Sequence, residues 1–195
     1  MSEMVIFAGP SIADTCIRSR CVAAQLRAPV QLGDLCQYTV KVPATIVILD
    51  GYFSQVPAVW HKEIMLLFSL GCRVIGAASM GALRAAELVD HGMEGVGWVY
   101  EQYRKGCLQD DDEVALLHAD AELGYQPLSL ALVNLRFLLT TDLLTETQHA
   151  TLCWLMLNCG LCNRTSPSGS NKRPEISPLI IGCGSVTRTS TKAVL

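Results

Sequence analysis

The sequence lacks a hydrophobic run long enough to cross a membrane. Half of its 195 residues are hydrophobic, but no stretch approaches the roughly 20 consecutive apolar residues that span a bilayer. The first ten residues, MSEMVIFAGP, also lack the basic region that precedes the apolar segment of a secretory signal. We therefore expect neither a membrane anchor nor a secretion signal, and a cytoplasmic protein.

The sequence also lacks an excess of basic residues. The chain has 15 Lys and Arg against 18 Asp and Glu, a net charge of −3, so no electrostatic excess points to a nucleic-acid partner. Five of the basic residues fall between 163 and 195, where only one acidic residue and no aromatic residue occurs. This Ser/Thr-rich stretch predicts a poorly ordered tail over 161–195, after a core domain over 1–160.

A disulfide framework is missing as well. The nine cysteines are an odd number, and those in the first half of the chain are scattered singly, which predicts reduced core thiols. One group of possible zinc ligands consists of His149, Cys153, Cys159 and Cys162. Because its spacing matches no common zinc site, we favour core packing for these residues.

Two further segments offer little for a metal ion or a cofactor. The acidic run 110–113 is better explained as a helix start, with Asp110 as N-cap and Glu113 three residues later, ahead of a helical stretch over 114–117. The turn 9–11 lacks the Gly-Lys-Ser/Thr ending of a phosphate-binding loop. We expect no metal ion and no cofactor.

What the sequence does contain is an alternation of strand and helix patterns. Short apolar segments ending in turn signals predict strands at 4–8, 45–49 and 73–77. Helical patterns occupy 12–27, 59–70, 80–89, 97–105, 129–139 and 143–157. The fold class is therefore α/β, with a small, mainly parallel sheet flanked by helices and additional C-terminal helices. In such a sheet, the turns after the three strands meet along one rim, where sites form.

The segment RVIGAASMGALRAAEL at 73–88 predicts a strand, a sharp turn, a serine and a helix. Ser79 then lies at the start of a helix, where unpaired amides, those of Met80 and Gly81 among them, could hold an oxyanion. The arrangement resembles the nucleophile elbow, with Ala77 in place of its first glycine. The alternative is that Ser79 is only a helix cap.

Lys62 is the candidate base for this serine. His61, Lys62 and Glu63 are consecutive on a helix whose other positions are nearly all apolar, so at least one of them must lie over apolar surface. Desolvation there would lower the pKa of Lys62 and make it a general base. The alternative is a lysine whose stem lies on the apolar surface while its amine reaches solvent or pairs with Glu63.

Other side chains could support the site. Asp50 and Gly51 follow the second predicted strand, and we expect them to face the same crevice as Ser79. Arg84 and Glu87 are spaced as an intrahelical ion pair, and one of them could also contact a partner. His118 is the alternative base for Ser79.

Several ordered motifs resemble the core of the TfuA family and cover about the first 140 residues. They are GPSI (9–12), GDL (33–35), DGYF (50–53), VWHKEI (59–64), GAASMGALRAAEL (76–88), GMEGVG (92–97), DDDEVALLH (110–118) and PLSLALVN (127–134). The C-terminal stretch from about Asn163 departs from the helical sequence that is common in that family, which puts any partner contact of that region in doubt.

The resemblance implies a role beside YcaO enzymes, which activate a peptide amide with ATP so that sulfur replaces its oxygen. The implied activity is hydrolysis of the C-terminal thiocarboxylate of a ThiS-like carrier protein, which releases sulfide for YcaO. The family's Ser-Lys pair falls on Ser79 and Lys62. The partners implied are YcaO, the carrier and the peptide substrate.

Two other functions stay open. In the first, the chain is a non-catalytic adaptor that brings peptide or carrier to YcaO through residues such as Arg84 and the acidic run. In the second, Ser79 acts as an ordinary esterase with His118 and one of the aspartates 110–112, although these lie closer in sequence than that fold usually allows.

Overall fold

A computed structural model describes residues 3–12, 14–53 and 56–158. Its centre is a five-stranded, all-parallel sheet in the order β2-β1-β3-β4-β5. The strands are β1 (Met4–Phe7), β2 (Gln25–Arg27), β3 (Thr45–Ile48), β4 (Arg73–Ala77) and β5 (Glu94–Val96). The predicted α/β class and the three predicted strands are confirmed.

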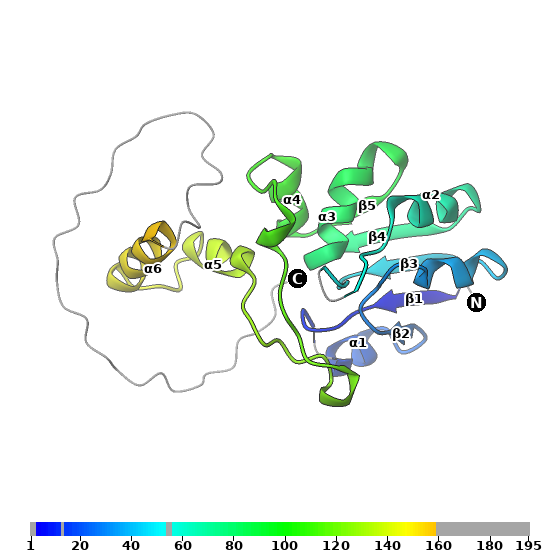
Figure 1. The fold of residues 1–195 in the computed structure, drawn as a ribbon, viewed down its shortest axis with the longest axis horizontal. Helices are drawn as coiled ribbons and strands as arrows, with labels where there is room; N and C mark the ends of the chain where they lie inside the picture. The colour runs from blue at the N-terminus through cyan, green and yellow to red at the C-terminus, as the bar shows by residue number, and fades with distance from the viewer. Residues whose placement is uncertain (1–2, 13, 54–55, 159–195) are drawn as a thin grey trace.

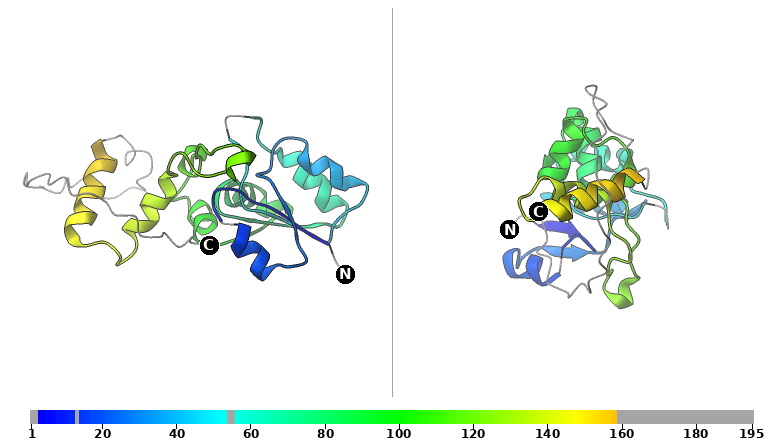
Figure 2. Two further views of the ribbon diagram at one scale, coloured as in Figure 1. Left: turned by 90° about the horizontal axis from the view of Figure 1, so that it is seen from below. Right: turned by 90° about the vertical axis from the view of Figure 1, so that its left-hand side faces the viewer.

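Helices cover both faces of this sheet. β2 lies on one side of β1 in the sheet. β4 and β5 follow β3 in the opposite direction along the sheet. Because crossovers between parallel strands are right-handed, α1 (Asp14–Arg20) and α2 (His61–Ser69) must cover opposite faces, as Figure 2 shows. On the α2 side lie η1 (Asp34–Thr39) and α3 (Ser79–Leu88), and α4 (Trp98–Arg104) packs beside α3.

The buried side chains alternate between these two layers. Val5 and Phe7 of β1 belong to the larger core under α2 and α3, whereas Ile6 belongs to a smaller cluster with Ile17 of α1. This alternation follows from the two-residue period of a strand. The strand order reverses between β1 and β3, and open α/β sheets place their sites at the carboxyl ends of strands beside such a reversal.

Two glycines let α3 lie unusually close to the sheet. A Cβ atom on Gly81 would collide with the carbonyl oxygen of Ile48, and one on Gly76 with the carbonyl oxygen of Gly81. The first turn of α3 is therefore fixed directly against the ends of β3 and β4. This contact determines the position of Ser79.

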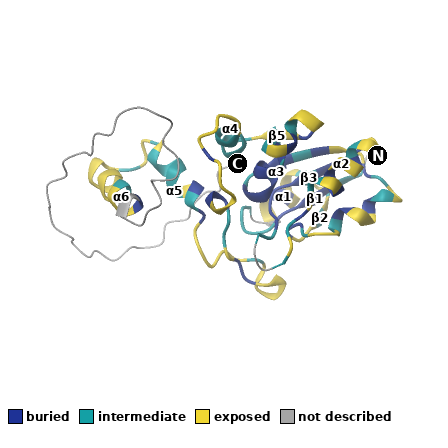
Figure 3. Cartoon of the chain, turned by 45° about the horizontal axis from the view of Figure 1, so that its top comes forward, coloured by how far each residue is buried: buried dark blue, intermediate teal, exposed yellow. Residues whose placement is uncertain are grey.

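After α4, the chain runs across the carboxyl ends of the strands (Figure 1). This crossing segment, residues 108–131, includes η3 (Asp111–Glu113) and η4 (Ala121–Leu123). It leads into α5 (Leu132–Leu139) and α6 (Glu146–Asn158), which extend away from the sheet. Most described side chains of α6 are exposed (Figure 3).

The structure corrects several expectations. The helix predicted over 12–27 ends at Arg20, because the chain after it pairs with β1 as β2. Residues 114–117 are not helical. Of the six described cysteines, all free thiols, Cys72 is buried and Cys21 packs against the smaller core cluster, whereas the prediction of core thiols is wrong for the exposed Cys16, Cys36 and Cys107. The predicted tail, 161–195, lies outside the described residues.

No helix within the described part of the chain is long and apolar enough to cross a membrane.

Candidate functional site

Ser79 is the first residue of α3 and follows β4 after a single turn residue. Ala78 has φ 55° and ψ 170°, and Ser79 has φ 25°. Residues with a Cβ atom rarely adopt positive φ, and the conformation of Ala78 lies in a region used almost only by glycine. The turn is therefore strained, which is a property of sites where a side chain is held for chemistry.

The surroundings of Ser79 are largely dry. Its side chain is buried, with 8% of the residue exposed, and its Oγ donates a long hydrogen bond of 3.4 Å to the carbonyl oxygen of Val114 in the crossing segment. The amide of Gly81 lies 3.4 Å from the carbonyl oxygen of Leu49. Because this amide already has an acceptor, Met80 is the better of the two predicted oxyanion donors.

Asp50 is buried at the end of β3 and serves the neighbouring turn. Its Oδ2 accepts hydrogen bonds from the amides of Gly9 (2.9 Å) and Ser11 (3.1 Å), and its Oδ1 accepts one from Ser11 Oγ (2.6 Å). Burial raises the pKa of Asp50, while these three bonds and the nearby His118 oppose that rise. Asp50 thus joins the end of β3 to the turn after β1.

His118, in the crossing segment, lies near Asp50. It is only 6% exposed, and its ring packs against Tyr52, with ring centroids 4.9 Å apart, and against Tyr125, at 5.8 Å. Gly51 packs closely against Met80 in the first turn of α3. A Cβ atom at position 51 would lie only 2.7 Å from Cγ of Met80. The structure therefore places Asp50, Gly51, Ser79 and His118 along one rim.

Lys62 does not have the environment that the sequence suggested. It lies in the first turn of α2, at the same end of the sheet as Ser79, but the residue is exposed. The expected desolvation of its amine is therefore wrong for the unbound chain. A surface hollow of about 330 Å³ is lined by Trp60, His61 and Lys62.

The charged residues near Lys62 form a small network between α2 and α3. Arg84 and Glu87 make the predicted ion pair at 2.6 Å, and Glu87 also contacts Nε2 of His61 at 2.8 Å. Arg84 Nε donates to the carbonyl oxygen of Val59 at 3.1 Å. The network fixes the loop before α2 against α3, so these side chains support the arrangement of the rim.

Glu63 has a structural position. It is buried, and it accepts hydrogen bonds from the amides of Trp60 (3.3 Å) and Gly33 (2.9 Å). The first bond caps α2 and the second ties the helix to the loop before η1. Glu63 is therefore occupied and does not extend toward Ser79.

Asp110 is the N-cap residue of η3, as predicted, and the rest of the acidic run forms this short helix. Asp110 makes no side-chain cap hydrogen bond at η3, and Glu113, 1% exposed, forms a bidentate pair with Arg136 of α5 at 2.7 and 2.8 Å. Within the described ranges, no three His, Cys, Asp or Glu side chains gather closely enough to hold a metal ion.

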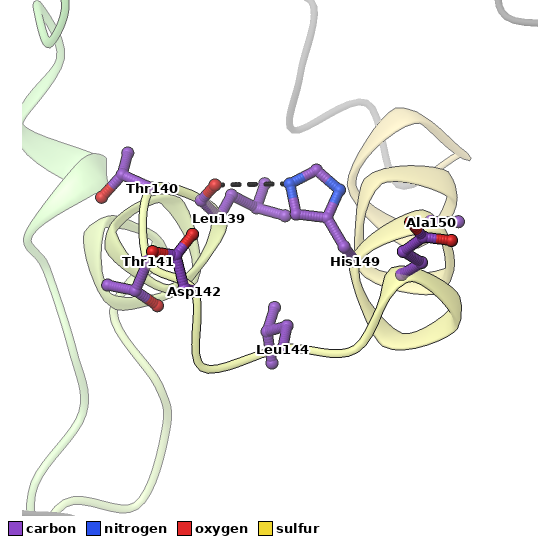
Figure 4. A pocket seen from close by; sticks show the side chains of 8 residues that line it. Leu139, Thr140, Thr141, Asp142, Leu144, His149 and Ala150 are labelled. Carbon is purple, nitrogen blue, oxygen red and sulfur yellow. Dashed lines mark hydrogen bonds between the residues drawn. The ribbon is translucent and has the colours of Figure 1, made fainter.

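A second hollow, of about 340 Å³, lies between α5 and α6, away from the rim (Figure 4). His149 reaches across it to the carbonyl oxygen of Leu139 at 3.3 Å, and its Nδ1 lies 3.7 Å from Sγ of Cys153. Cys159 and Cys162, the other members of the possible zinc group, lie outside the described residues. This hollow shares no residue with the Ser79 rim.

The sequence did not reveal the side chains that contact Asp50 and His118. Ser11 was treated only as part of a turn, and Tyr52 and Tyr125 were not singled out, although both frame His118. The tyrosines could not have been found from spacing, because Tyr125 reaches His118 through an irregular turn at positive φ.

The comparison with known families agrees with these motifs. A family model described as TfuA-like protein matches residues 50–159, more than half of the chain. The chain belongs to the TfuA-like family. No curated protein matches it. The TfuA-like match begins at Asp50 and includes Lys62, Ser79 and His118, while β1 and the turn that Asp50 holds lie before it.

Proposed function

We propose that this TfuA-like protein supplies sulfide to a YcaO enzyme by hydrolysing the C-terminal thiocarboxylate of a ThiS-like carrier. YcaO would use that sulfide to convert a peptide amide into a thioamide. The family match supports the accessory role in general. The hydrolysis rests on one observation in particular, the geometry of Ser79.

Ser79 combines three properties of a serine nucleophile. It follows a parallel strand through a strained turn, its hydroxyl is buried, and it begins a ten-residue helix whose first amides point toward the rim. A serine that only capped the helix would not require the positive φ of Ala78. The strain is therefore easier to explain by a hydroxyl that must be presented to a substrate.

The first half-reaction follows from these groups. Neutral Lys62 takes the proton of the Ser79 hydroxyl, and Oγ attacks the thiocarboxylate carbon. The amide of Met80 stabilises the developing oxyanion. The bond between carbon and sulfur then breaks, and the sulfur leaves as hydrosulfide with the proton that Lys62 held. The carrier remains as an ester on Ser79.

Because Lys62 is exposed in the unbound chain, its part in this scheme requires the carrier. A docked carrier tail would cover the hollow beside Trp60, His61 and Lys62 and withdraw the amine from water, which favours its neutral form. Lys62 is thus proposed to become a base only when substrate is present.

The exposure of Lys62 also favours a second candidate function, that of a non-catalytic adaptor. The crossing segment exposes four large apolar side chains, Leu117, Leu123, Leu128 and Leu130, and such a surface can bind a partner protein. In this case the chain would bind carrier or peptide for YcaO and cleave nothing.

The test is sulfide release from a thiocarboxylated carrier by wild type, Ser79→Ala and Lys62→Met. The hydrolase predicts background release from Ser79→Ala and a loss of about 100-fold or more for Lys62→Met. Ser69→Ala and Lys105→Met, at exposed positions of α2 and the end of α4, are the matched controls and should release sulfide as wild type does. An adaptor predicts no release by any of the five proteins, with carrier binding retained.

A further inference from the structure

His118 is a buried titratable group that the Ser-Lys scheme leaves without a role. Its Nδ1 lies 3.0 Å from the carbonyl oxygen of Ala119. A carbonyl can only accept a hydrogen bond, so Nδ1 carries the proton, and in the neutral ring the lone pair is on Nε2. The ring therefore offers a base at one defined nitrogen.

The ring is also held in a fixed orientation. Tyr52 lies on one side at an interplanar angle of 56°, and Tyr125 meets it edge-on at 79°. The backbone around it is pinned by a bridge between His118 and Pro127 and by the bond from the Ala119 amide to the carbonyl oxygen of Gln126, 2.8 Å long. A side chain fixed from several directions loses little further entropy when it acts on a substrate.

Two chains of contacts connect His118 to the Ser79 turn. In the crossing segment, Val114 accepts the hydrogen bond of Ser79 Oγ four residues before His118. On the β3 side, Gly51 packs against Met80, and the next residue, Tyr52, packs against His118. His118 and the Ser79 turn are therefore linked through the crossing segment on one side and through Gly51 and Tyr52 on the other.

Asp50 completes this arrangement. It lies close enough to His118 for a positive imidazolium to lower the pKa of Asp50. Asp50 is therefore a charged neighbour of the ring. Asp50 itself is held in place by the hydrogen bonds from Gly9 and Ser11.

We propose that His118 is the base of the second half-reaction, in which water hydrolyses the ester between the carrier and Ser79. This inference rests on the proposed function. Nε2 takes a proton from water while the water oxygen attacks the ester carbon. The bond from that carbon to Ser79 Oγ breaks, and the proton on Nε2 passes to Oγ. One water is consumed, Ser79 is restored, and the carrier leaves as a carboxylate with one proton released to solvent.

His118→Asn tests this step. The asparagine amide can keep the hydrogen bond to the Ala119 carbonyl but has no basic nitrogen. With excess thiocarboxylated carrier, we expect one rapid equivalent of hydrosulfide per enzyme, followed by turnover slowed about 100-fold or more. Intact-mass spectrometry should then find the carrier attached to the enzyme, and the second substitution Ser79→Ala should remove both the burst and the adduct.

The pH profile separates chemistry from structure. Wild-type turnover should fall as acid protonates the base, whereas the residual turnover of His118→Asn should only rise with hydroxide concentration. His149→Asn, the same change on α6, is the matched control and should behave as wild type. Turnover of His118→Asn at the wild-type rate would overturn the inference, and so would loss of the burst from a variant that unfolds at the wild-type temperature. If wild type itself releases no hydrosulfide and forms no adduct, the proposed hydrolysis fails, and this inference fails with it.

Discussion

Backbone strain in the described residues is concentrated around the candidate site. Three non-glycine residues have positive φ, namely Ala78, Ser79 and Tyr125. The first two form the turn that presents the hydroxyl, and the third packs against His118. Strain of this kind persists only where the surrounding structure enforces it. Its location at both sides of the rim supports a common role for Ser79 and His118.

Ala78→Gly should stabilise the protein if the turn is strained as described. Glycine adopts φ 55° and ψ 170° without a Cβ clash, so the free energy of unfolding should rise by about 1 kcal/mol after the entropic cost of glycine is subtracted. Ala86→Gly, within the regular part of α3, should instead lower it by about 1 kcal/mol. Urea unfolding of the two variants measures the contrast, and equal destabilisation by both would show that Ala78 is not strained.

Among the helices and strands, the sequence predicted most accurately those whose apolar residues face the core. The strand at 73–77 was predicted with its observed bounds, because its residues face the core and a sharp turn follows it. β2 and β5 were missed, since each has three residues and lies at an edge of the sheet. Their strand conformation comes from pairing with a neighbour, which no local pattern reveals.

The burial of individual groups was harder to predict. Lys62 has apolar neighbours along its helix, but it is exposed because α2 packs against the rest of the fold through Glu63, Ile64 and Leu67. The segment 114–117 looked helical from its composition, but its Leu117 amide and carbonyl pair instead with Ser129 and Leu128. Both errors arise from tertiary contacts that override local preference.

Asp50 joins two elements, the turn after β1 and the end of β3, and this junction should respond to pH. Burial raises the pKa of Asp50 in the folded state, so the stability it contributes is complete at low pH and is lost as pH rises from the unfolded value of 3.8 through the folded one. Asp50→Asn does not titrate, and it can still accept the bonds from the Gly9 and Ser11 amides through its oxygen while its NH2 group donates to Ser11 Oγ. Across that interval its stability relative to wild type should increase, by at most about 1.4 kcal/mol per pH unit.

Urea unfolding between pH 3.5 and 7 measures this difference. Asp90→Asn, which changes an exposed carboxyl group, is the control and should follow wild type at every pH. If the stability of Asp50→Asn relative to wild type fell with rising pH, the hydrogen bonds from Gly9 and Ser11 would outweigh burial, and the pKa of Asp50 would be lowered.

At the scale of the whole molecule, the candidate chemistry lies at one end of the sheet. The turns after β1, β3 and β4 meet there, α2 and α3 both begin there, and the crossing segment covers it (Figure 1). The parallel order made this rim predictable from the strand pattern. The crossing segment was not predictable as its cover, because residues 108–131 contain only two short 3-10 turns and no strand.

This one-sided arrangement predicts where the carrier binds. With Ser79→Ala, which binds without turnover in the proposed scheme, excess thiocarboxylated carrier should slow amide hydrogen exchange in the crossing segment and at the start of α2, because docking covers their exposed amides. α1, on the face of the sheet opposite α2, and β2, at the edge far from β5, should exchange as in the free protein. The matched control ligand is the same carrier with an ordinary C-terminal carboxylate, in which oxygen takes the place of sulfur. It should protect the same segments, because the rest of its surface is unchanged. Protection confined to α1 and β2 would place the carrier away from Ser79. In that case a docked carrier could not cover Lys62, and His118 could not act on an ester at Ser79.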